Sequence, residues 1–306
     1  MNVLSLFNAM PGEVAHGLIW GIMAIGVYIT YKVLDIADLS VDGTMCTGGA
    51  VCIMMLTAGK PMWLALLVAT FAGVLAGLAT GILHTAMGIP AILAGILTQL
   101  GLYSVNLKIM GKANVPINNQ KYSLLVSLLN VKGVTFYKNS ILIVAICLAI
   151  IIAVLYWFFG TEIGASLRAT GNNQSMARAQ GINTNVNKVL GLMISNGIVA
   201  FSSALLAQYQ GFADINMGRG AIVIGLAAVI IGEVVFGKLF RNFALRLTAV
   251  ALGGVIYYVV LQVVIWLGFD TDLLKLLSAL VVAVFLAIPY IKKKYFTTVK
   301  TSGEVK

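Results

Sequence analysis

The sequence predicts an all-α polytopic membrane protein, and two observations support this class. Hydrophobic residues make up 60% of the 306 residues and charged residues only 10%, whereas about a quarter of the residues in a soluble domain are charged. Apolar windows of about 20 residues, the length that crosses a bilayer, recur along the chain. We therefore expect helices that bury their backbone polar groups within the membrane.

These windows predict about nine transmembrane helices, with a range of eight to ten because the second window is short. Together they form a single transmembrane domain over residues 1–306. Two long connections separate the windows, one over 110–139 and one over 160–187. The windows are 14–32, 44–59, 62–86, 90–109, 140–159, 188–209, 220–236, 246–267 and 273–291.

The distribution of Lys and Arg predicts the orientation, because cytoplasmic loops are enriched in both. The C-terminal tail contains Lys292, Lys293 and Lys294, so we place it in the cytoplasm. Counting back through nine spans puts loop 160–187 in the cytoplasm, and loop 110–139 and the N-terminus outside. Loop 110–139 contains a segment with amphipathic character, Tyr122–Leu129.

Two short motifs resemble each other. Ala37–Gly43 (ADLSVDG) precedes the second span, and Ala213–Gly218 (ADINMG) precedes the seventh. The predicted topology has them enter from opposite sides, as in the inverted repeats of transporters. This predicts broken helices near 35–45 and 213–220; chance similarity over six residues is the alternative.

Acidic residues in or beside a span usually pair, face water or have a function. Asp42 is interpreted as a cap of its own helix and Asp38 as a residue that shapes the break. Glu233 either pairs with Lys238 or Arg241 or lines the cytoplasmic end of a pathway. The pathway candidates are Asp38, Ser40, Asp42, Asp214, Asn216 and Glu233.

The segment Arg168–Ile182 is polar and basic between two apolar spans. It predicts a short helix with Asn172 or Asn173 as N-cap and Gly181 at its C-terminal end. A compact helix in a loop of a membrane protein favours docking by another protein, although Arg178 also fits a solvated positive-inside charge. The docking candidates are Arg168, Gly171, Asn172, Asn173, Ala177, Arg178, Gln180 and Gly181.

Motifs of soluble enzymes are missing from the sequence. It has no GxxxxGK[ST], HExxH or GxSxG pattern, so we expect no enzyme activity and no cofactor or metal bound by this chain. The net charge of +10 lies at span ends and does not predict nucleic-acid binding. Cys46, Cys52 and Cys147 are interpreted as small core residues, His16 and His84 as structural, and Gly73, Gly77 and Gly81 as a helix-packing face.

Leu167–Asn173, Ala177 and Gly181–Asn183 resemble the coupling segment in permease subunits of ATP-binding-cassette importers, in the group with branched-chain amino acid and ribose permeases. Asp38–Val41 is similar to an early span of the sugar permeases, and Ala227–Gly237 to a late one, with Glu233 where those carry glycine. The resemblance covers residues 14–290 and is closest to permeases paired with tryptophan- or tyrosine-type binding proteins.

The resemblance implies an importer in the bacterial plasma membrane, surrounded by lipid. Its partners are a second permease chain (a homodimer), a cytoplasmic ATPase that binds ATP and Mg, and an extracytoplasmic binding protein or lipoprotein. The solute is a small molecule, with an amino acid of the aromatic kind favoured. Three alternatives remain. The first is an ATP-driven permease for a sugar or nucleoside, and the second is a stand-alone secondary transporter that uses intramembrane carboxylates. The third is a non-transporting membrane scaffold or receptor whose cytoplasmic loop recruits a regulator.

Overall fold

The computed structural model describes residues 3–118, 122–131, 139–237, 239–240, 242–268, 276–285 and 287. They form α1 (Val3–Tyr28) with the π-helical turn η1 (Ile29–Val33), α2 (Val41–Thr57), α3 (Met62–Thr85), α4 (Ala91–Met110), β1 (Asn114–Pro116) and the 3₁₀ turn η2 (Leu128–Val131). Then follow α5 (Ser140–Gly160), α6 (Glu162–Asn172), α7 (Gln174–Ala179), α8 (Thr184–Gln210), β2 (Phe212–Asp214), α9 (Ala221–Phe236) and α10 (Phe243–Trp266).

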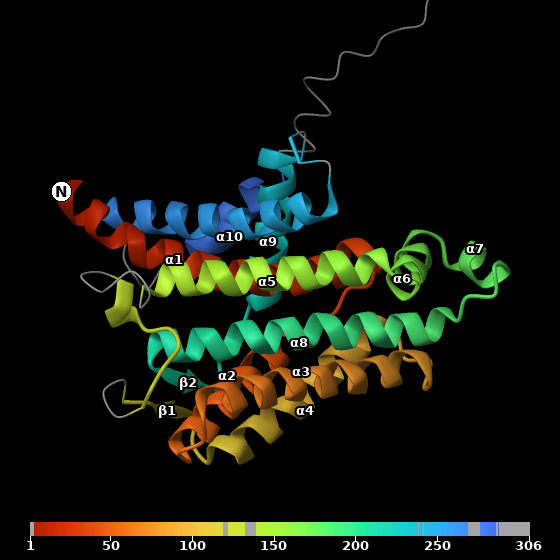
Figure 1. The fold of residues 1–306 in the computed structure, drawn as a ribbon, viewed down its shortest axis with the longest axis horizontal. Coiled ribbons are helices and arrows are strands. Elements are labelled where there is room, and N and C mark those ends of the chain that lie inside the picture. The colour runs from red at the N-terminus through yellow and green to blue at the C-terminus, as the bar shows by residue number, and fades with distance from the viewer. Residues whose placement is uncertain are drawn as a thin grey trace, which may run out of the picture.

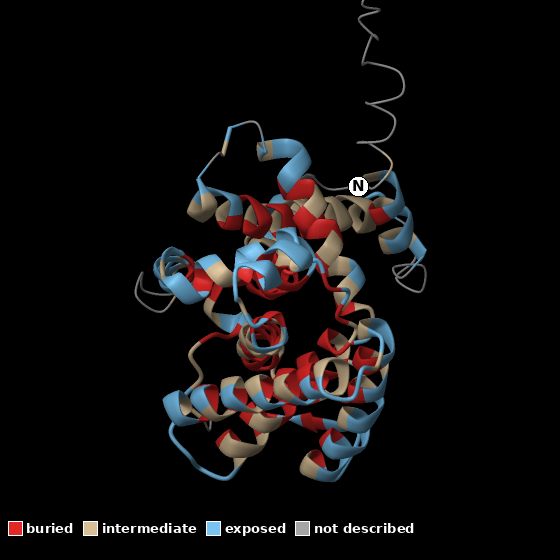
Figure 2. Cartoon of the chain, turned by 90° about the vertical axis from the view of Figure 1, so that its right-hand side faces the viewer, coloured by how far each residue is buried: buried red, intermediate tan, exposed pale blue. Residues whose placement is uncertain are grey.

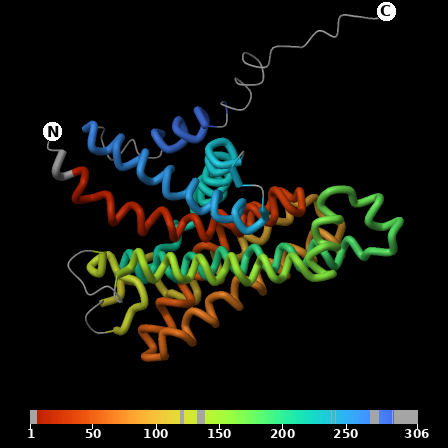
Figure 3. The backbone as a smooth tube through the Cα atoms, turned by 45° about the horizontal axis from the view of Figure 1, so that its top comes forward, coloured from red at the N-terminus to blue at the C-terminus, as the bar shows by residue number. Residues whose placement is uncertain are grey.

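Most long helices run side by side in layers (Figure 1), with α1 and α10 in one layer, α5 next, and α8, α3 and α4 beyond. The N-terminus and the strands lie at one end of the bundle, and α6 and α7 lie at the other end. The tube view shows the same separation of the two ends (Figure 3). Buried residues concentrate on the helix faces that turn inward (Figure 2).

The prediction of an all-α polytopic membrane protein is confirmed. Among the described residues, six helices are long and apolar enough to cross a membrane, and three shorter apolar helices accompany them: α2, α9 and Leu276–Phe285. The predicted windows fall on these nine described helices. The predicted number of nine transmembrane helices is therefore approximate, because it includes the three helices that are shorter than a full span. At 17 and 16 residues, α2 and α9 are about 25 Å long, which is less than the ~30 Å hydrocarbon core.

Loop 110–139 has local structure that the sequence did not predict. β1 pairs antiparallel with β2, with Asn114 opposite Asp214, although the sequence predicted only helices. Within the amphipathic segment Tyr122–Leu129 and the residues after it, only the turn Leu128–Val131 is helical. The reason is tertiary hydrogen bonding: the Leu125 amide donates to Gln208 Oε1 at 2.9 Å, and the Ser127 amide donates to Ser140 Oγ at 3.1 Å.

The packing of the helices supports an inverted repeat. In each half, a long helix (α1 or α8) is followed by a non-helical segment and then by a short helix (α2 or α9). The next helix of each half packs along the long helix of the other half: α3 packs along α8, and α10 packs along α1. The end of α2 lies by the segment that follows β1, where the Tyr122 hydroxyl donates to the Thr57 carbonyl at 3.5 Å. The end of α9 lies by η1, through Glu233 and Lys32. The two short helices therefore run in opposite directions, which chance similarity of two motifs does not explain.

The glycine face of α3 permits close backbone contact. A Cβ atom on Gly73 would overlap Asn196 and Ala200 of α8, and one on Gly77 would overlap the Leu192 carbonyl. In the other half, a Cβ on Gly21 of α1 would lie 2.8 Å from the Ala251 oxygen of α10. In lipid, where helices gain little from the hydrophobic effect, such contact stabilises their association.

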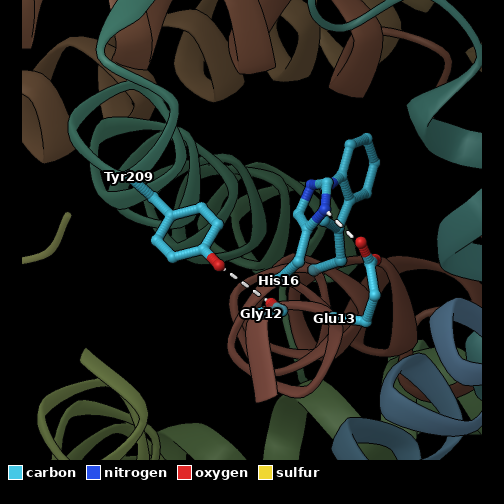
Figure 4. A network of polar contacts seen from close by, with 5 residues as sticks. Gly12, Glu13, His16 and Tyr209 are labelled. Carbon is cyan, nitrogen blue, oxygen red and sulfur yellow. Dashed lines mark hydrogen bonds and ion pairs between the residues drawn. The ribbon is translucent and has the colours of Figure 1, made fainter. Parts of the chain in front are cut away.

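A cluster around His16 joins three helices at the N-terminal end (Figure 4). Trp20 Nε1 donates to His16 Nε2 at 3.0 Å, and the His16 ring lies 4.4 Å from the ring of Tyr258 on α10. Tyr209 of α8 donates its hydroxyl hydrogen to the Gly12 carbonyl at 2.8 Å. Glu13 lies 3.8 Å from His16 Nδ1. The contacts agree with a structural interpretation of this histidine.

We expect Gly77→Leu to destabilise the protein by about 1–3 kcal/mol, because the new side chain must enter the α3–α8 contact. The matched control is Gly101→Leu on α4, since nothing lies within 4 Å of a Cβ at Gly101. The melting temperature of the purified chain in mild detergent measures both. Equal melting temperatures for the two variants would contradict the close-packing interpretation.

Candidate functional site

The short helix predicted in loop 160–187 is α7, and hydrogen bonds define both of its ends. Asn173 is its N-cap and accepts a hydrogen bond from the Met176 amide at 3.0 Å, whereas Asn172 is the last residue of α6. At the other end, Gly181 has φ +78 and its amide donates to the Arg178 carbonyl. The Ile182 amide donates to the Ala177 carbonyl, which completes a Schellman motif.

Helix α6 is fixed to the transmembrane bundle by polar and close contacts. Asn187 of α8 donates through Nδ2 to Thr170 Oγ1 at 2.9 Å, and Ser166 donates to Asn187 Oδ1 at 3.3 Å. Gly171 lies so close to the Val33 backbone that a Cβ there would overlap the Val33 carbonyl. Helix α6 therefore contacts the turn that leads out of α1.

The eight docking candidates divide between two places. Arg168, Gly171 and Asn172 line a cavity of about 1270 Å³ together with Lys32 and Arg246. The remaining candidates lie on α7 or at its ends, where Ala177 is buried. Arg178 and Gln180 are exposed, and Arg178 Nε donates to Thr184 Oγ1 at 2.8 Å. The exposed residues of that group are Asn173, Arg178, Gln180 and Gly181.

Asp38 is buried at the break before α2 and is fully hydrogen-bonded. Its Oδ1 accepts from the Ser40 amide at 2.9 Å and from the Ser40 hydroxyl. Its Oδ2 accepts from Asn196 Nδ2 at 2.7 Å, halfway along α8. Asn196 Oδ1 in turn accepts from Thr44 Oγ1 at 2.6 Å. Asp38 therefore holds the break in shape and attaches it to α8.

Asp42 caps a helix, but not the one to which it belongs. Its carboxylate accepts from the Gly220 amide at 2.9 Å and from the Ile222 amide at 3.0 Å, so it caps the N-terminus of α9. The expectation that it caps α2 is wrong. A Cβ atom on Gly218 would overlap the Asp42 carbonyl, so the two repeated motifs are in direct contact. We call this contact between the beginnings of α2 and α9 the half-helix junction.

Asp214 and Asn216 form the same local turn as Asp38 and Ser40. Asp214 Oδ1 accepts from the Asn216 amide at 2.7 Å, as Asp38 Oδ1 accepts from the amide two residues later. The surroundings differ, because Asp214 Oδ2 accepts from Asn114 in β1 at 3.2 Å. The second motif therefore lies at the strand end of the bundle and is partly exposed.

Glu233 lies apart from the other pathway candidates, at the end of α9. It forms an ion pair with Lys32 at 3.1 Å, with both side chains about half exposed. The expected partners, Lys238 and Arg241, lie outside the described residues. The structure thus divides the six candidates among the junction, the strand end and the opposite end of the bundle.

Several polar residues of the site were missed by sequence reasoning. A cavity of about 150 Å³ beside the junction is lined by Asp42, Gln99, Asn106, Asn216 and Arg219, among others. A polar residue within an apolar window, where its burial is costly, was the available signal. Within the part of the chain that the structure describes, His, Cys, Asp and Glu form no group that could hold a metal ion. The missed residues are Lys32, Thr44, Asn106, Asn196 and Arg219.

Comparisons with known proteins agree with this architecture. Residues 14–288 match the family described as branched-chain amino acid transport system / permease component. A tyrosine transport system permease protein of Clostridioides difficile is 40% identical over 89% of this chain and 88% of its own. An uncharacterized protein of Rickettsia prowazekii is 32% identical over 94% and 99%.

A more distant relative is the galactofuranose transporter permease protein YtfT of Escherichia coli, which is 27% identical over 87% of this chain and 75% of its own. No solved structure matches the chain significantly. Because the family match spans nearly the whole transmembrane bundle, the chain belongs to the branched-chain amino acid transport system permease components, the membrane-spanning subunits of ATP-binding-cassette importers.

Proposed function

We propose that this permease imports an amino acid of the aromatic kind, as a homodimer, with ATP and Mg bound by a separate cytoplasmic ATPase. An extracytoplasmic binding protein or lipoprotein delivers the solute. The name of the Clostridioides difficile relative supports the solute class. The galactofuranose relative favours a sugar as the second candidate.

The contact between Gly171 and the Val33 backbone carries the proposal. Val33 is followed by Leu34, whose side chain packs against Gly191 of α8. Asp38 and the half-helix junction come a few residues later. A displacement of α6 and α7 by the ATPase is therefore passed to the junction through close backbone contacts. Because hydrogen bonds define both ends of α7, we expect the segment to move as a rigid body rather than to unfold.

The proposed orientation has the N-terminus outside and the C-terminus in the cytoplasm of a bacterial plasma membrane. Helices α6 and α7 lie at the end of the bundle opposite the N-terminus (Figure 1). Basic residues gather at the α6–α7 end, and under the positive-inside rule this supports a cytoplasmic location for that end. They include Lys32, Arg168, Arg178, Lys188 and Arg246.

ATP-driven switching requires that the nucleotide states differ in how they bind the permease, because a partner shifts an equilibrium only through differential affinity. The exposed residues of α7 are available for this contact: Met176 is 62% exposed, and Ala177 beside it is buried and anchors the helix. A stand-alone secondary transporter has no use for such a segment. We therefore favour the importer over that alternative.

We expect Arg178→Glu to lower recovery of the co-expressed ATPase with the permease at least tenfold. The substitution places a negative charge on the docking face and removes the hydrogen bond to Thr184. Affinity purification followed by an ATP hydrolysis assay measures the effect. Lys112→Glu, the same charge change at the strand end, is the control and should leave recovery unchanged. Full recovery of an active ATPase with Arg178→Glu would remove α7 as the docking site.

We expect Gly171→Leu to abolish solute uptake while the ATPase still binds, because the new side chain pushes α6 away from Val33. Uptake into proteoliposomes and ATPase recovery are measured on the same preparation. Gly160→Leu at the end of α5 is the control, since nothing lies within 4 Å of a Cβ there. Normal uptake by Gly171→Leu would show that the displacement of α6 is not transmitted through its contact with Val33.

A further inference from the structure

Helices α4 and α5 are both poorly covered by the rest of the chain, but they differ in polarity. Their most apolar windows are 22% and 17% buried, with mean hydropathies of 1.3 and 3.1. Polar side chains are costly against lipid, so α5 suits a lipid-facing position and the polar part of α4 does not. Gln99, Tyr103 and Asn106 of α4 instead line the cavity of about 150 Å³ at the half-helix junction.

Asn106, which also lines this cavity, has an unused hydrogen-bond acceptor. The residue is fully buried, and its Nδ2 donates to the Gly43 carbonyl at 3.3 Å. Its Oδ1 has no hydrogen-bond partner among the described residues. A buried acceptor without a partner is destabilising, so its presence calls for a donor that the protein itself does not supply.

Two opposite charges line the same cavity. Asp42 approaches from the beginning of α2 and Arg219 from the segment before α9. Asp42 accepts only backbone hydrogen bonds, and within the described ranges neither residue forms an ion pair. The cavity therefore offers a negative group and a neutral acceptor near a positive group.

An α-amino acid carries the complementary pair of charges at neutral pH. We propose that this cavity binds the head group of the transported amino acid, with its ammonium on Asp42 and Asn106 Oδ1 and its carboxylate on Arg219. The site refines the proposed import function and depends on it. Pockets that enclose a whole ligand are usually larger than about 300 Å³, so the solute's side chain extends beyond this cavity.

The test uses the purified permease–ATPase complex in lipid nanodiscs without its binding protein, and labelled L-tyrosine as the probe. Tyramine lacks the carboxylate, and 3-(4-hydroxyphenyl)propionate lacks the ammonium. For the wild type we expect saturable tyrosine binding that neither analogue displaces well. Arg219→Ala should weaken tyrosine binding about ten- to a hundredfold and make tyramine as good a competitor as tyrosine.

Asn106→Leu should raise the dissociation constant of tyrosine about tenfold or more. It also removes the long hydrogen bond from Asn106 Nδ2 to the Gly43 carbonyl, but that carbonyl still accepts from the Thr47 hydroxyl, so the melting temperature should stay close to that of the wild type. Lys108→Ala, which removes a positive charge from the same helix, is the matched control and should bind tyrosine normally. Asp42→Asn does not test solute binding alone, because the substitution also changes the cap of α9.

The outcomes separate the site from the import function. If the wild type transports tyrosine with its binding protein, but Arg219→Ala and Asn106→Leu bind it normally and reject tyramine, the site is wrong and the import function stands. A transporting wild type that binds no tyrosine in the nanodisc also overturns the site. If the wild type transports no amino acid, the proposed solute class fails before any variant is compared.

Discussion

The structure depends on how two interrupted helices satisfy their backbone amides inside the membrane, where an unpaired group is expensive. The first amides of α9 are satisfied by Asp42, which belongs to α2 in the other half of the chain. The break before α2 is closed by Asp38, which is itself held by Asn196 of α8. Neither short helix is complete without residues outside it, so the two halves must fold together.

This mutual capping also explains the small residues around the junction. A carboxylate reaches the α9 amides only if the two chain segments touch, and Gly218 permits this beside the Asp42 carbonyl. Gly171 permits α6 to approach Val33 in the same way. Glycine thus shortens the path from the docking helix to the junction.

Local features of the fold follow from the sequence, and long-range contacts do not. The apolar windows, the repeated Ala-Asp motif and the Gly181 helix end depend on residues close together in the chain, and each was predicted. The contact of Asp42 with Gly220, of Asp38 with Asn196 and of Lys32 with Glu233 each join residues more than 150 positions apart. A single sequence contains no signal for such pairs, so Asp42 was assigned to its own helix.

The two repeated motifs are alike in their local turn but unlike in their surroundings, and this difference suits an importer. Asp38 is 2% exposed and its segment follows Leu34, close to α6. Asp214 is partly exposed and bonded to Asn114, and Asn216 and Arg219 of its segment line the small cavity. In the proposed mechanism the buried copy receives the movement of the ATPase, and the accessible copy meets the solute. Asp42 links the two copies, so a change in one alters the capping of the other.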